Sequence, residues 1–165
     1  MQRERSWVRE GLVVGFIAYA TVAVFYSAFD LLASRGMLFT VDLMGRALFQ
    51  GLRDPAVLMF PITTDLRMVF GYNAVHLAVS LSVGLTVVRL VEVGERDSVM
   101  APRVLLVIIA GFVLTVLGVG YVTAPLRELL PWWSIILANA LATACAGWYL
   151  LRRRPGVLVH LTDAN

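Results

Sequence analysis

The sequence predicts an all-α, polytopic membrane protein: a four-transmembrane-helix bundle with a long hydrophobic outer loop carrying a short interfacial helix between helices 1 and 2. Composition is the first observation, because 59% of the 165 residues are hydrophobic and only 15% are charged. Soluble domains are about 45–50% apolar and about 25% charged. A soluble chain of this size buries only about two thirds of its surface on folding. Lipid is therefore the expected solvent for the remaining apolar side chains.

The second observation is that four long stretches carry no charged residue. They contain 19, 21, 23 and 23 residues and are Gly11–Phe29, Met68–Val88, Val104–Leu126 and Leu129–Leu151. About 20 apolar residues cross a hydrocarbon core about 30 Å thick, and continuous rather than alternating runs favour helices over barrel strands. We predict one transmembrane domain over 1–165. Its helices are expected at about 8–32, 65–91, 103–124 and 131–151.

The outer loop over 34–64 stays rich in Leu, Phe and Met. Thr40 is expected to cap a short helix over Val41–Gln50, with Asp42 favourable in its first turn. The apolar side of this helix is expected to consist of Val41, Met44, Leu48 and Phe49. We expect the helix to lie on the outer membrane surface or to fold over the mouth of the bundle.

The last two helices are separated by a short turn that contains Pro125 and Pro131. Proline disfavours helix in the residue before it and often stands just inside a helix start. Helices 3 and 4 are therefore predicted to be antiparallel neighbours.

The distribution of arginine, the third observation, predicts the orientation. All 14 basic residues are arginines; with the N-terminus inside, nine lie on the inner side and five on the outer side. Positive loops stay in the cytoplasm, so both termini and the tail over 152–165 are predicted to be cytoplasmic, in a bacterial inner membrane. Because the arginines lie between apolar runs rather than on one face, the net charge of +3 does not indicate nucleic-acid binding.

Helix 2 carries the most informative polar pattern, in which Asn73, His76, Ser80 and Gly84 follow one another at spacings of three, four and four. At about 100° per residue they share one helix face, and polar groups in lipid normally face the bundle interior. One interpretation is a ligand, haem or proton site centred on His76, which is also the only candidate metal ligand. The other is hydrogen bonding and close packing between helices, in which His76 meets Asn139.

In the predicted orientation, several polar groups gather in the outer half of the membrane around His76. The candidate ligand-binding residues are Tyr26, Asp30, Tyr72, Asn73, His76, Tyr121 and Asn139. A site formed by them would open outward beneath the loop, although helix ends are in general more polar than helix middles. The small residues expected to mediate helix packing are Ser80, Gly84, Gly111, Gly118 and Thr143.

No motif of a soluble enzyme is present, and the single Cys145 excludes an intrachain disulfide. We therefore expect a non-catalytic accessory, structural or assembly subunit, whose partners are the bilayer and other membrane proteins or further copies of itself. A binding or redox protein with a small hydrophobic ligand, quinone or haem around His76 is the first alternative. An oligomeric transporter or channel is the second. The sequence identifies no particular cofactor.

Overall fold

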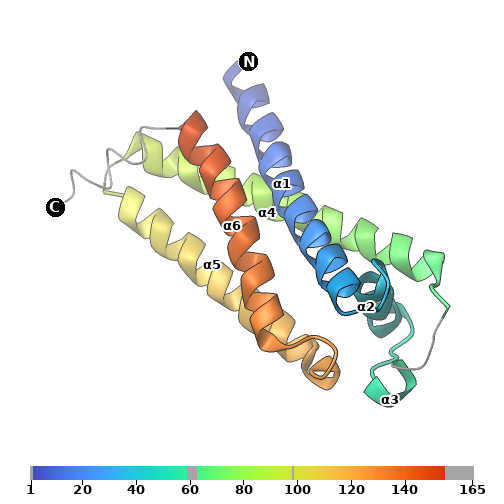
Figure 1. The fold of residues 1–165 in the computed structure, drawn as a ribbon. Helices are drawn as coiled ribbons and strands as arrows, with labels where there is room; N and C mark the ends of the chain where they lie inside the picture. Colours follow the sequence, from blue (N-terminus) through green and yellow to red (C-terminus); the bar gives the residue numbers. More distant parts are fainter. Residues whose placement is uncertain (1, 59–62, 98, 155–165) are drawn as a thin grey trace.

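A computed structural model describes residues 2–58, 63–97 and 99–154, with side chains from Trp7 onward. Within these ranges the secondary structure is entirely helical, and four helices are long and apolar enough to cross a membrane. They are α1 (Gln2–Leu32), α4 (Leu66–Arg96), α5 (Ala101–Val122) and α6 (Trp132–Arg153) (Figure 1). The predicted all-helical class with four apolar helices is confirmed. These helices indicate a multi-pass membrane protein.

Three short elements complete the described chain, namely α2 (Phe39–Phe49), α3 (Pro55–Leu58) and the 3-10 turn η1 (Ala124–Leu126). The long helices alternate in direction (Figure 1). One end of the bundle, here called the terminal end, holds the start of α1, the α4–α5 connection and the end of α6. The opposite end, here called the loop end, holds α2, α3 and the α5–α6 turn. Residues 59–62 of the predicted outer loop and the part of the predicted tail from 155 onward lie outside the described residues.

Helices α1 and α4 cross (Figure 1) and form the most extensive contact between the described helices. Both helices carry small residues at the crossing, and an added Cβ shows how close the backbones are. On Gly15 it would lie 2.5 Å from the carbonyl oxygen of Ser80, and on Gly84 it would overlap the backbone of Gly11 and Gly15. Small residues allow membrane helices to approach this closely. Ser80 and Gly84 therefore lie in the contact between α4 and α1.

Helix α6 packs against α1 through a ridge of alanines. Ala138, Ala142 and Ala146 are buried at successive intervals of four residues, which places them on one side of the helix. Leu150 continues this side into a cluster that also contains Val14. Helix α1 therefore contacts both α4 and α6.

A second core lies at the loop end and holds α2 against the bundle. Its buried members are Leu43, Ala47, Leu58, Leu126, Leu129 and Leu130. Leu48 and Phe49, which were expected on the apolar side of the loop helix, are about half exposed, at 52% and 49%. Helix α2 packs against the α5–α6 turn through Leu43 and Ala47, and the expectation that its apolar side lies at the membrane surface stays a prediction.

Gly111 and Gly118 of α5 were expected to pack against another helix, but unlike Gly84 of α4 they contact none. An added Cβ on Gly111 or Gly118 would meet nothing within 4 Å, and Thr143 on α6 is exposed. The positions of α5 that pack inward are Ala101, Val116 and Gly120. Gly111 and Gly118 therefore do not mediate a contact between the described helices.

Candidate functional site

The polar side chains of α4 meet α1, and they form a small cluster with Tyr19. The Tyr19 hydroxyl donates a hydrogen bond of 2.8 Å to Oδ1 of Asn73, whose amide donates 2.9 Å to the carbonyl of Val69. The ring of His76 lies between two tyrosines, with centroid distances of 5.2 Å to Tyr19 and 5.8 Å to Tyr72. Tyr19, Tyr72, Asn73 and His76 are here called the imidazole cluster.

Within the imidazole cluster, His76 is packed but has no polar partner. Its ring is half-buried, and no hydrogen bond joins either ring nitrogen to another described residue. The nearest polar side chains, Asn73 and Tyr19, already form a hydrogen bond with each other. The side of α4 beside the ring is open, since Val75 and Val79 are exposed.

Tyr19 was absent from the sequence-predicted site, although the sequence holds a signal for it. It follows Gly11 and Gly15 at further intervals of four residues, so it continues the face of α1 that meets α4. The signal is visible only once the glycines are known to mark that contact.

Asn139 does not reach His76. Its amide donates a hydrogen bond of 2.8 Å to the carbonyl of Ile135 within α6 itself. The expected link between His76 and Asn139 is therefore not formed, because Tyr19 of α1 covers the polar face of α4. Tyr121 is also outside the cluster, with 83% of its surface exposed.

Asp30 forms a second polar centre, at the loop end. Its carboxylate is fully buried and accepts two hydrogen bonds of 2.7 Å, one from the backbone N–H of Thr40 and one from its hydroxyl. The first N–H groups of a helix lack partners within the helix and favour negative charge. Asp30 therefore caps α2 from a neighbouring helix.

This arrangement corrects the role predicted for Thr40. Helix α2 begins at Phe39 and has no side-chain cap of its own, so Thr40 lies inside the first turn and donates to Asp30 instead. Arg35 supports the same region by donating a hydrogen bond of 3.0 Å to the carbonyl of Leu129 in the α5–α6 turn.

Tyr26 belongs to the aromatic packing around this second centre. Its ring stands edge-to-face against Phe25 and Phe29, with centroid distances of 5.2 Å and 6.3 Å, and it packs against the loop-end core. The predicted site residues therefore divide into two groups, one around His76 and one around Asp30.

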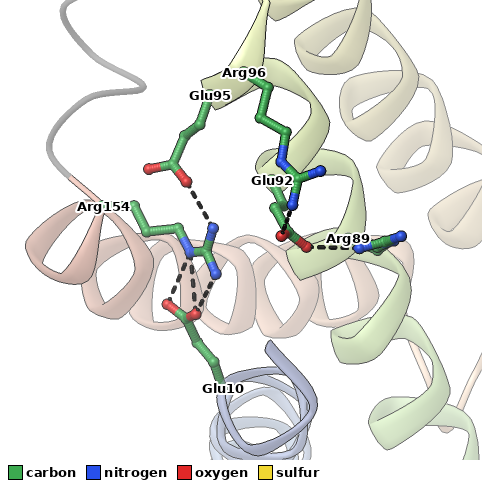
Figure 2. A network of polar contacts seen from close by, with 6 residues as sticks. All are labelled: Glu10, Arg89, Glu92, Glu95, Arg96 and Arg154. Carbon is green, nitrogen blue, oxygen red and sulfur yellow. Dashed lines mark hydrogen bonds and ion pairs between the residues drawn. The ribbon is translucent and has the colours of Figure 1, made fainter. Parts of the chain in front are cut away.

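A charged network, which the sequence reading missed, links three helices at the terminal end (Figure 2). The guanidinium of Arg154 donates to Glu10 of α1 and to Glu95 of α4, each at a closest distance of 2.6 Å. Only 15% of the Arg154 side chain and 11% of Glu10 is exposed. The hydrogen bond that Arg154 donates to Glu10 holds the pKa of Arg154 above its usual range. We call Glu10, Glu95 and Arg154 the three-helix network.

Sequence patterns gave only a weak signal for this network. Glu10 and Glu95 lie just outside the first two apolar runs, on the same predicted side as Arg154. In the sequence, however, Arg154 is indistinguishable from Arg152 and Arg153. In the structure these two arginines are exposed and lie over the rings of Trp148 and Tyr149.

The arrangement offers hydrogen bonding rather than metal ligation. Among the residues with described side chains, no three His, Cys, Asp or Glu side chains are close enough to hold a metal ion together. Comparisons of the chain with models of protein families, with curated proteins and with solved structures found no match.

Proposed function

We propose that this protein is a small non-catalytic subunit of the membrane that packs against another membrane protein, or a second copy of itself, through α5. The bilayer and these proteins would be its partners, and nucleic acid would not. The proposal rests mainly on the surroundings of α5. Much of this helix is exposed, although the other long helices cross or pack along one another.

The α5 face that supports the proposal carries Gly111, Thr115 and Gly118. At 3.6 residues per turn these positions fall within an arc of about 60°, roughly a third of a turn from the side of the helix that packs inward. The space beside both glycines is open. At the α1–α4 crossing the same kind of residue admits a neighbouring backbone, so this face is suited to receive another helix.

We further propose the placement of the chain in the membrane. The terminal end would be cytoplasmic and the loop end would face outward, in a bacterial inner membrane, as the excess of arginine at the terminal end favours. The exposed tryptophans are consistent with this placement, because tryptophan is enriched at membrane–water interfaces. Trp148 lies near one end of the bundle, and Trp132 and Trp133 lie near the other. Helix α2 would then lie at the outer interface, with Leu48 toward the lipid headgroups.

Cysteine cross-linking in native membranes tests the α5 proposal. The only native cysteine is first removed as Cys145→Ala, and a single cysteine is introduced as Thr115→Cys. Leu106→Cys serves as the matched control, because Leu106 is exposed on the other side of α5. We expect a bifunctional thiol reagent to give a discrete adduct of reproducible mass from Thr115→Cys only. Equal labelling by a lipid-soluble maleimide at both positions, with no adduct at either, would contradict the proposal.

A further inference from the structure

The imidazole cluster contains two polar groups whose partners are missing among the described residues. Neither ring nitrogen of His76 nor the hydroxyl of Tyr72 forms a hydrogen bond there, whereas the nearby polar groups of Tyr19 and Asn73 are engaged. His76 lies nine residues beyond Arg67, which is about 13 Å along the helix axis. In the membrane placement proposed above, on which this inference rests, water is scarce at this depth and an unpaired donor is costly. A partner from the lipid phase is therefore expected.

The surroundings of these two groups restrict the chemistry of that partner. Neutral imidazole offers one donor and one acceptor, and a phenol hydroxyl also donates, so the partner must carry a hydrogen-bond acceptor. The walls are aromatic, formed by Tyr19 and Tyr72 together with Phe16, which lies 6.2 Å from Tyr19 between ring centroids. Aromatic side chains favour offset or edge-on contact with a flat ring.

We propose that His76 and Tyr72 form a binding site for a lipid-soluble quinone, which enters from the membrane between α1 and α4. One ring carbonyl accepts a hydrogen bond from the imidazole, and the quinone ring packs against the aromatic walls. The open side of the site is bordered by Phe16 and Val79, each with 56% of its surface exposed. Binding alone is proposed, without electron transfer, and it is independent of the face offered by α5.

An ester carbonyl of a phospholipid offers the same acceptor, and the experiment separates the two sources. The full chain is labelled with ¹⁵N-histidine and placed in nanodiscs of ether-linked phospholipid, which contain no ester carbonyl. The chain has two histidines, His76 and His160, so in the variant His160→Gln the only histidine signal is that of His76. Decylubiquinone is then titrated as the probe.

We expect the imidazole signal of His76 to shift saturably as decylubiquinone is added. The proposal is overturned by no shift, or by a shift that grows linearly without saturating. It is also overturned if ester-linked lipid alone moves the signal and decylubiquinone cannot reverse that change, because the site is then occupied by phospholipid.

Variants test the two residues separately. His76→Leu should raise the Kd for decylubiquinone about tenfold, the effect of losing one hydrogen bond. Tyr72→Phe keeps the aromatic ring and should raise the Kd severalfold. Tyr121→Phe is the matched control, because Tyr121 is exposed and outside the cluster, and its Kd should be unchanged. Equal Kd values for all three variants would contradict the site even if His76→Leu folds poorly, since Tyr72→Phe preserves the packing.

Discussion

At the scale of single residues, the charged groups of this protein hold helices together rather than merely marking the ends of membrane spans. Arg154 joins α6 to Glu10 of α1 and to Glu95 of α4. Removing one partner of a largely buried ion pair leaves the other charge without compensation, which costs more than the pair itself contributes. The three-helix network should therefore matter for stability out of proportion to its size.

Arg154→Ala should lower the free energy of unfolding by about 2 kcal/mol, since it leaves two carboxylates close together and only partly hydrated. Arg153→Ala is the matched control, because it removes the same charge from the adjacent position but loses only a contact with the ring of Tyr149, worth less than about 1 kcal/mol. Reversible unfolding in mixed micelles measures both. Equal losses for the two variants would refute a special role for Arg154.

Asp30 and Thr40 make a second prediction at this scale. Thr40→Val keeps the shape of the side chain but removes the hydroxyl that Asp30 accepts from, so stability should fall by about 1–2 kcal/mol. In Thr86→Val the lost hydroxyl bonds only to the carbonyl of Ser82 in its own helix, and the change should be close to zero. Unfolding measured by helix loss in far-ultraviolet circular dichroism compares them. A Thr40→Val protein as stable as the native chain would show that the buried pair contributes nothing.

At the scale of helices, the backbones of α1 and α4 approach each other closely at their crossing. Gly84→Ala should destabilise the protein by about 2 kcal/mol, because the added methyl group overlaps backbone that cannot move aside easily. Gly111→Ala makes the same change in open space on α5. There the higher helix propensity of alanine, up to about 1 kcal/mol, should leave the isolated chain equally or slightly more stable. A thermal unfolding series in detergent tests the pair, and a tolerated Gly84→Ala would mean that the crossing is looser than described.

Helix α2 gives a further prediction, on its placement at the outer interface. In the Cys145→Ala background, a nitroxide label at Leu48 should be relaxed by oxygen, which partitions into lipid, more than by a water-soluble nickel chelate. A label at Leu43, which is 2% exposed, should be shielded from both. Strong relaxation of the Leu48 label by the nickel chelate would place that side of α2 in water instead.

At the scale of the whole molecule, the number and position of the long helices could be predicted from the sequence because each apolar run is long enough to cross lipid. The pairing of helices could not. In lipid, apolar periodicity does not select a neighbour, and the stripe from Asn73 to Gly84 indicates a face without indicating what meets it. Tyr19 of α1 occupies that face, where Asn139 of α6 was expected.

The predicted site was incomplete for a related reason. Asp30 could be recognised in the sequence as a polar residue at the end of the first apolar run. Its partner Thr40, however, looks in the sequence like an ordinary N-cap residue of the next helix. Only the folding of α2 onto the bundle brings the two together. Likewise, the role of Arg154 depends on which helix ends are adjacent, and that follows from the α1–α4 and α1–α6 contacts.

The central claim is that four helices span the membrane with the terminal end in the cytoplasm and the loop end outside. Paired reporter fusions after Asn165 and after Gln50 test it most directly. A green fluorescent protein fused after Asn165 should be fluorescent and alkaline phosphatase fused there inactive, whereas alkaline phosphatase fused after Gln50 should be active. Active alkaline phosphatase after Asn165, or the same reporter pattern at both positions, would contradict the claim.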